Sequence, residues 1–285
     1  MLPHLCRRVC LFTAQQHESF LLALVSNDGL ESHVEHLAVK DFHGGFLEPA
    51  LTTFTDVLRR ICAARKLRSL YVDKRHSAFY DDFPQEPGGS DPWACTTMVK
   101  EVRRSLDLLA DHTSEEYSLE QIVSPFTELF GGANFDKPDH LNGDWPVHRG
   151  LRRLAVRGMT LDEDAAKSVG WRRRMHHLRM LVVKDPIIIG RLMGKDKSEL
   201  ESVLRMARSM HPDAHLIIVF GEWQLKQWKR DWEHVKATPK GLKGCCRITF
   251  FNDKNEVDWL QNKGLDGSLW TLGEKGNDED IYMAS

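Results

Sequence analysis

One short apolar pattern recurs along the chain and constrains the fold more than any other feature of the sequence. An apolar residue is followed, after two residues of any kind, by two apolar residues that have one residue between them. Apolar residues at every second position are typical of a β-strand, in which they share one face of a sheet. The pattern occupies residues 34–39, 67–72, 151–156 and 178–183, with weaker versions at 216–220 and 248–251.

The residue between the last two apolar positions is expected to point to the opposite face of the sheet. In a solenoid of stacked strands that face is exposed, so these residues would lie on an open surface. They are Ala38, Tyr71, Ala155 and Val182. A polar break, such as Lys184-Asp185, follows each strand and indicates a turn.

Segments with helical periodicity lie between the predicted strands. They cover residues 49–64, 97–109 and 198–210, and Ser198 with Glu201 forms a capping box at the start of the last one. A strand, a turn, a helix and another parallel strand form the unit of a right-handed α/β solenoid. We therefore predict an α/β fold, an irregular leucine-rich-repeat-like solenoid with parallel strands on one side and helices on the other.

The predicted strands are unevenly spaced along the chain. The steps between their second apolar positions are 33, 84 and 27 residues, whereas leucine-rich repeats run about 20–29 residues. The long step predicts an insertion or a degenerate repeat over 74–150, with loops at 81–92 and 131–148 and a helical hairpin between them. The whole chain is predicted to form a single domain over 1–285 that ends in a flexible tail, 273–285.

Four segments together carry a resemblance to a known family. They are residues 2–11, 19–25, 30–39 and 150–161, and the most telling of them reads Leu2-Pro3-His4-Leu5-Cys6-Arg7-Arg8-Val9-Cys10-Leu11. In this order they resemble the substrate-recognition region of fungal F-box proteins with degenerate leucine-rich repeats. The resemblance implies a non-enzymatic protein of the ubiquitin pathway, whose repeats select a protein for ubiquitination or sequestration.

The F-box is the helical module that docks on the Skp adaptor, and in such a protein it would lie before residue 1. The resemblance therefore covers the binding region alone. It predicts a protein partner, but it predicts no contact between these residues and the Skp adaptor.

Composition narrows the class of partner and the compartment. A net charge of −2, from 39 basic and 41 acidic residues, favours neither a general nucleic-acid binder nor attraction to an acidic membrane. No apolar run reaches the roughly 18–20 residues of a membrane span, and the first residues do not resemble a signal peptide. The six cysteines include no CxxC pair, and Cys245 and Cys246 are adjacent, which suits neither a zinc knuckle nor a regular disulfide framework. We predict a reducing compartment, the cytosol or the nucleus, with Cys62 and Cys246 as small buried apolar residues.

The most distinctive cluster of side chains contains Trp223, Trp228 and Trp232, with three basic residues among them. The last two tryptophans are four residues apart, which puts them on one face of a helix. Terminal repeats need a cap, and tryptophan also dominates protein-binding hot spots. We interpret the cluster first as an end cap and second as a binding patch.

The densest basic run is residues 171–179, which include Arg172-Arg173-Arg174 and His176-His177. Such a run is typical either of a solvated surface or of a contact with nucleic-acid phosphates. Trp171 is the only aromatic residue in it other than histidine, and acidic residues precede it at 162–164, so we favour the solvated surface.

The sequence nominates no catalytic, cofactor-binding or metal-binding residue. It contains no GxSxG, HExxH or glycine-rich phosphate loop in a suitable context, and the loop aspartates lack the spacing of a calcium site. We therefore expect no cofactor.

These observations predict an interaction scaffold whose strand surface binds a protein. That surface would include His36, Ala38, Ser69, Tyr71, Arg153, Ala155, Arg179 and Val182. The residues nominated for partner contact are His36, Tyr71, Arg153, Arg179, Trp223, Trp228 and Trp232. The alternatives are an enzyme of unrecognised family with a site in 74–150, and nucleic-acid binding through 171–179.

Overall fold

The structure is a computed structural model, and it divides the chain into two compact units, residues 1–129 (unit 1) and 130–285 (unit 2). The residues that it describes are 6–39, 48–72, 104–105, 108–109, 119–124, 150–157, 160–161, 176–184, 187–188, 199–221, 243–253, 259–272 and 282–284. Several predictions fall outside these ranges: the loops at 81–92 and 131–148, residues 172–174 of the basic run, and Trp223, Trp228 and Trp232.

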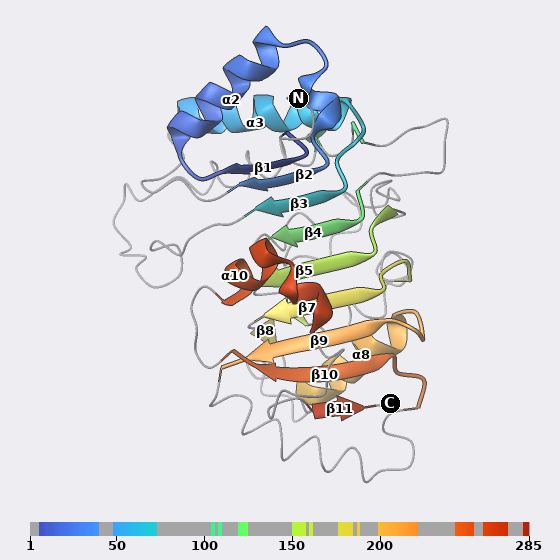
Figure 1. Cartoon of the computed structure of the whole chain (residues 1–285). Helices are drawn as coiled ribbons and strands as arrows, with labels where there is room; N and C mark the ends of the chain where they lie inside the picture. The colour runs from blue at the N-terminus through green and yellow to red at the C-terminus, as the bar shows by residue number, and fades with distance from the viewer. Residues whose placement is uncertain are drawn as a thin grey trace. The chain divides into compact units, whose positions relative to one another are not determined.

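Among its described residues, unit 1 has four strands that pair in parallel in the order β1-β2-β3-β4 (Figure 1). They are β1 (Arg8–Leu11), β2 (His36–Val39), β3 (Ser69–Val72) and β4 (Gln121–Ser124). The connections contain α2 (Ala14–Ser26), the short 3-10 helix η1 (Leu30–His33) and α3 (Glu48–Ala63). The helix predicted over 49–64 is confirmed by α3, which packs against α2.

Strand β4 lies inside the segment predicted as an insertion. Leu119 and Ile122 occupy the first two positions of the recurrent pattern, but Ser124 stands where the third apolar residue is expected. The register nevertheless pairs Ile122 with Leu70 of β3. The segment therefore supplies a strand, as a degenerate repeat would, and is more than a helical hairpin.

Unit 2 also has four described strands in parallel, in the order β5-β7-β9-β10. They are β5 (Arg153–Arg157), β7 (Met180–Lys184), β9 (His215–Phe220) and β10 (Arg247–Asn252). A separate parallel pair joins β6 (Thr160–Leu161) and β8 (Ile187–Ile188). Helix α8 (Glu199–Ser209) confirms the helix predicted over 198–210, although the capping residue Ser198 is outside the described residues.

The end of the chain contributes a further strand to unit 2. Strand β11 (Tyr282–Ala284) pairs antiparallel with β10, joining Met283 to Thr249. It lies within the predicted tail, 273–285, so the last residues of that segment have regular structure.

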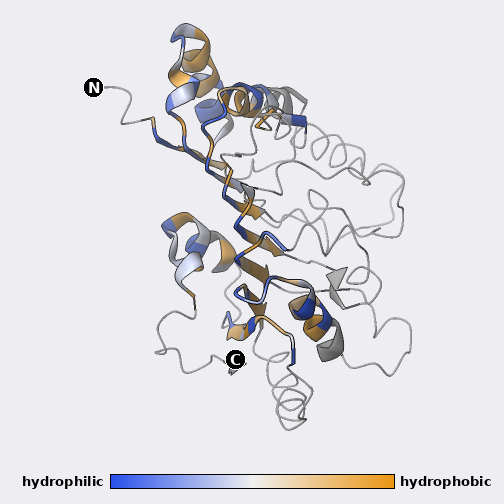
Figure 2. Cartoon of the chain, turned by 90° about the vertical axis from the view of Figure 1, so that its right-hand side faces the viewer, coloured by the Kyte–Doolittle hydropathy of each residue, from blue (hydrophilic) through white to orange (hydrophobic). Residues whose placement is uncertain are grey.

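Helices lie on both faces of the unit 2 sheet. Figure 2 places α8 on one side of the strands, and α10 (Trp259–Asp266) with the 3-10 helix η5 (Ser268–Thr271) on the other. The Cys246 thiol lies 4.0 Å from the Met210 sulfur, just after α8. The ring of Phe251 lies 5.3 Å from that of Trp259 in α10. Cys246 and Phe251 are five positions apart, and residues an odd number of positions apart along a strand point to opposite faces of the sheet. Their contacts therefore agree with helices on both faces.

The expectation of an exposed strand surface is wrong. Ala38, Tyr71, Ala155 and Val182 are each at most 9% exposed. In unit 2 the reason is that helices cover both faces, as parallel strands with apolar residues on both sides require. In unit 1, Ala38, Tyr71 and Val123 are neighbours in register, and all three are buried. The predicted α/β class is confirmed; the leucine-rich solenoid stays a prediction, and in unit 2 the helices are not restricted to one side.

A buried ion pair ties β7 to the end of β10. Lys184 and Asp253 are in direct contact, and each side chain is 3% exposed. The register places Lys184 beside Val219 of the intervening strand, so the lysine side chain spans β9. Burying two charges is costly unless they remain paired. The contact therefore holds Lys184, predicted as part of a polar break, inside the sheet.

Two neighbouring isoleucines of β9 test whether both faces are buried. Ile217 and Ile218 point to opposite faces and are both fully buried. Removing a buried side chain of this size costs about 2–5 kcal/mol. We expect Ile217→Ala and Ile218→Ala each to lower the free energy of unfolding, measured by urea denaturation, by an amount in this range. A loss below about 0.5 kcal/mol for Ile217→Ala alone would show that the α10 face is open to solvent.

Candidate protein-binding surface

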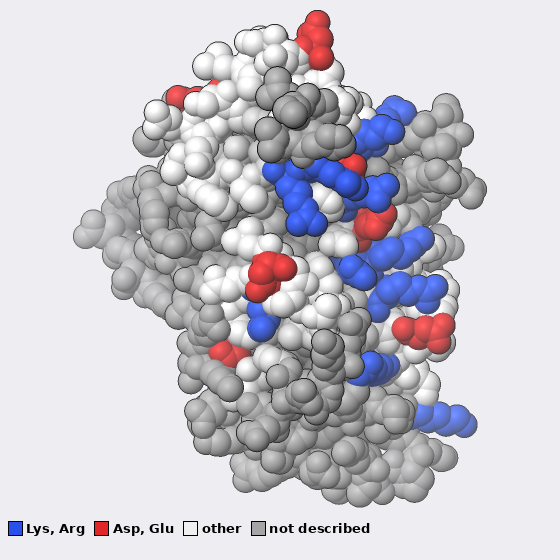
Figure 3. All heavy atoms as spheres, in the orientation of Figure 1, with Lys and Arg blue, Asp and Glu red and all other residues white. Residues whose placement is uncertain are grey.

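The starts of the four parallel strands of unit 2 form one edge of its sheet, because parallel strands begin at the same side. We call this the amino edge of unit 2 and define it as residues 150–153, 176–180, 211–215 and 243–247. Its charged side chains are Arg152, Arg153, Arg179, Lys243, Arg247 and, as the single carboxylate, Asp213. In Figure 3 lysine and arginine side chains lie along the edge of the unit 2 sheet where its strands begin.

Backbone hydrogen bonds fix the order of these residues. The Arg179 amide donates to the Arg152 carbonyl at 2.7 Å, and the His215 amide donates to the Arg179 carbonyl at 2.9 Å. The Arg247 amide donates to the Ala214 carbonyl at 3.2 Å. Arg152 and Arg179 therefore lie opposite each other on adjacent strands, about 4.8 Å apart at their backbones.

The arginines alternate between the two faces of the sheet. Arg153 shares a row with Met180, His215 and Arg247. The side chains of this row point to the same face of the sheet as the residues covered by α10. Those of Arg152 and Arg179 point to the face covered by α8. Arg152, Arg153, Arg179 and Lys243 are exposed, and Arg247 is half-buried. The amino edge thus presents cations on both sides.

The corresponding edge of unit 1 is partly neutralised. Glu35 accepts a hydrogen bond from Arg7 at 2.8 Å, and its carboxylate lies 3.8 Å from Arg68. The amino edge of unit 2 has five basic side chains and one carboxylate, a higher ratio of cations to anions than at the edge of unit 1. It is therefore the stronger candidate for binding an anionic group.

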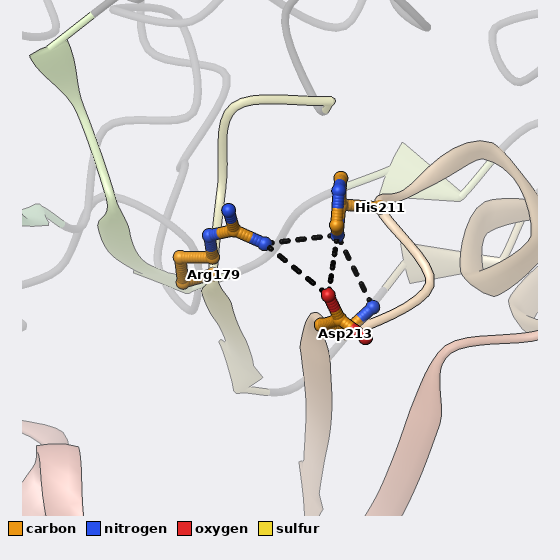
Figure 4. A network of polar contacts seen from close by, with 3 residues as sticks. All are labelled: Arg179, His211 and Asp213. Atoms are coloured by element: carbon orange, nitrogen blue, oxygen red, sulfur yellow. Dashed lines mark hydrogen bonds and ion pairs between the residues drawn. The ribbon is translucent and has the colours of Figure 1, made fainter.

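Three side chains of the amino edge form a polar network (Figure 4). Arg179 Nη1 lies 2.9 Å from His211 Nδ1, and the backbone amide of Asp213 lies 3.2 Å from the same nitrogen. The Asp213 carboxylate is 3.6 Å from His211 Nδ1 and 3.9 Å from Arg179. The ring of His176 is 5.2 Å from that of His211, between centroids.

This geometry determines the tautomer of His211. The guanidinium and the amide can only donate, so Nδ1 must accept both hydrogen bonds and carries no proton. The ring proton of neutral His211 is therefore on Nε2. The network holds Arg179 in place and leaves His211 with an N–H donor on the nitrogen that faces away from Arg179.

His215 is a neutral member of the same edge. Its Nε2 lies 2.7 Å from the Thr249 hydroxyl. Burial, and to a smaller extent the positive charge of Arg247, lower the pKa of His215 to about 4. At neutral pH the positive charge of its row therefore comes from Arg153 and Arg247.

The residues predicted from the sequence to contact a partner differ in their exposure. Arg153 and Arg179 are brought to the same edge and are exposed. His36 begins β2 and is half-buried, and burial lowers its pKa. Tyr71 is buried, which removes it from any exposed surface. The partner contacts themselves stay predictions, as does a site in 74–150, most of which is outside the described residues.

The sequence contains a signal for the amino edge that the prediction did not use. Arginine follows the first apolar residue of the pattern in Leu67-Arg68, Leu151-Arg152 and Leu178-Arg179. Equivalent positions of parallel strands lie side by side, so this repeated arginine predicts a basic edge. The pattern gives no such signal for His211, Lys243 and Arg247, because β9 and β10, at whose starts they lie, match it only weakly.

Comparisons with protein-family models, curated proteins and solved structures gave no match to this chain. Within the described residues, no group of three or more metal-ligating side chains is suited to holding a metal ion. None of the described helices is long and apolar enough to cross a membrane. Cys62 and Cys246 are buried, as predicted, and burial raises the pKa of both thiols.

The lowered pKa of His215 predicts how stability depends on pH. The folded protein disfavours the charged form, whereas the unfolded chain takes up a proton near pH 6.5. Stability should therefore be complete above pH 6.5 and fall as the pH is lowered to about 4. His17, which is buried beside Phe54 and has a pKa lowered to about 4, should act in the same direction.

We expect His215→Gln to reduce this pH dependence by up to about 1.4 kcal/mol per pH unit between pH 4 and 6.5. The measurement is the urea unfolding free energy at several pH values. The control is His33→Gln, since His33 is exposed and its substitution should leave the slope unchanged. An unchanged slope in His215→Gln would mean that His215 is not buried in the neutral form.

Proposed function

We propose that this chain is a non-enzymatic interaction protein and that the amino edge of unit 2 binds an acidic segment of a partner protein. The observation that supports this most is the segregation of charge. The edge has five lysines and arginines and one carboxylate, in a chain whose net charge is −2. A local basic surface on a nearly neutral protein favours a specific acidic partner over general attraction to polyanions.

The chemistry of the cations supports a carboxylate-rich ligand. Four of the five are arginines, whose planar guanidinium forms paired hydrogen bonds with carboxylates. Arg153 and Arg247 lie in β5 and β10, and backbone hydrogen bonds hold Arg152 and Arg179 just before β5 and β7. Less conformational entropy is therefore lost on binding than with cations on irregular loops.

A protein is favoured over a nucleic acid because the described amino edge lacks exposed rings other than histidine. Binding of single strands normally uses aromatic side chains on which bases stack. The resemblance to F-box substrate-recognition regions points in the same direction. It makes selection of a protein for ubiquitination or sequestration, in the cytosol or the nucleus, the proposed role.

Charge reversal tests the proposal. A fluorescent peptide of alternating glutamate and glycine would be titrated with the full chain, and binding followed by anisotropy at several salt concentrations. We expect Arg153→Glu combined with Arg179→Glu to weaken binding roughly tenfold, about 1.4 kcal/mol, because two attractive contacts become repulsive.

The matched control is Arg60→Glu combined with Arg59→Glu, which makes the same charge change on exposed residues of α3 in unit 1. It should retain most of the wild-type affinity. Equal weakening by both double variants would mean that only net charge matters. Tighter binding of oligothymidine than of a peptide with equal charge would favour the nucleic-acid alternative.

A further inference from the structure

We infer that His211 makes partner binding at the amino edge depend on pH, because its protonation transfers the Asp213 carboxylate from Arg179 to His211. This inference rests on the proposed function and concerns the regulation of that same surface. When His211 is neutral, Arg179 is engaged within the protein. When His211 is protonated, Asp213 pairs with the imidazolium, and the Arg179 guanidinium becomes available to a carboxylate of the partner.

The neutral form of His211 is the one that the network of Figure 4 describes, and in it Arg179 has two contacts. Its Nη1 donates to His211 Nδ1 at 2.9 Å, and the Asp213 carboxylate lies 3.9 Å from the same Nη1. The hydrogen bond uses one donor of the guanidinium, and the carboxylate offsets part of its charge. The Arg179 side chain is 53% exposed, so a partner can reach it once these contacts are broken.

Protonation of His211 makes this contact repulsive. Both ring nitrogens of an imidazolium are donors, so Nδ1 can no longer accept from Arg179 or from the Asp213 amide. Two cations then face each other, and the Asp213 carboxylate, 3.6 Å from Nδ1, is within reach of the new N–H. The Asp213 side chain is 81% exposed and has room for this small movement. The edge gains one positive charge, and Asp213 no longer offsets that of Arg179.

Asp213 is the acid that protonated His211 meets, since it is the single carboxylate among the described residues of the amino edge. The other charged or titratable side chains of the segments that lead into β7 and β9 are basic residues and histidines. They are Arg179, His176 and His177 before β7, Arg208 in the last turn of α8, and His215 at the start of β9. The ring of His176 is 5.2 Å from that of His211. Burial lowers the pKa of His215 to about 4, so His215 stays neutral where histidine ordinarily titrates.

Affinity at two pH values tests the inference. The fluorescent glutamate–glycine peptide would be titrated with the full chain at about pH 8 and about pH 5.5, between which histidine changes its charge. The glutamates of the peptide, whose ordinary pKa is about 4.3, stay ionised at both. Circular dichroism at each pH would check that every variant is folded. We expect the wild type to bind roughly fivefold more tightly at the lower pH, about 1 kcal/mol.

Two substitutions separate the titration of His211 from its consequence for Arg179. In His211→Asn the side-chain oxygen can still accept from Arg179, but asparagine does not titrate. We expect this variant to bind at both pH values as the wild type does at about pH 8. In Arg179→Gln the imidazole still titrates, but no guanidinium is released, so the fivefold ratio should fall below about twofold. The matched control is His176→Asn, which removes the neighbouring ring and should keep most of the ratio.

Each outcome bears on a different statement. If the wild type binds the peptide equally well at the two pH values, the pH dependence is wrong and the acidic-partner function stands. If the peptide binds at neither pH, both are wrong. A ratio that persists in His211→Asn, or that His176→Asn removes equally, would assign the dependence to other histidines and overturn the inference. A ratio that persists in Arg179→Gln would also overturn it, because the charge of His211 alone would then change the affinity.

Discussion

The parallel pairing of strands that carry apolar side chains on both faces determines which parts of the sheet are buried. In unit 2 the row Ala155, Val182 and Ile217 faces α10, while Leu154, Leu181 and Leu216 face the α8 side. A parallel sheet of this kind is stable only when both faces are covered. The buried Lys184–Asp253 pair reinforces it, since separating the two charges in the interior is costly.

Burial of both faces leaves the ends of the strands as the accessible parts of the sheet. Two of the five cations of the amino edge, Arg152 and Arg179, follow the first apolar residue of the pattern in their segments. Arg152 and Arg179 are neighbours because their strands are paired in register. The same pairing that buries the core thus also aligns the cations, and we propose that partner binding depends on this alignment.

Local periodicity was sufficient to predict most strands and two helices, because each depends on residues close in sequence. It missed β4, where Ser124 interrupts the apolar alternation. It also misassigned Tyr71 and Val182 to an open surface, because alternation does not reveal whether a second layer covers the sheet. The Arg179–His211 contact joins residues 32 positions apart. Helix α8 separates the two residues in the sequence, and the pairing of β7 with β9 brings them together, so sequence spacing could not predict this contact.

Unit 2 is accessible at its amino edge and closed on its α10 face. The thiol-labelling rates of Arg153→Cys and Val182→Cys, resolved by peptide mass spectrometry from those of the native cysteines, measure both properties. Val182 is fully buried and Arg153 is exposed. We predict that Arg153→Cys reacts at nearly the rate of a free thiol, and that Val182→Cys reacts at least about a hundredfold more slowly, through local opening. Similar rates at the two positions would mean that the α10 face is as open to solvent as the amino edge.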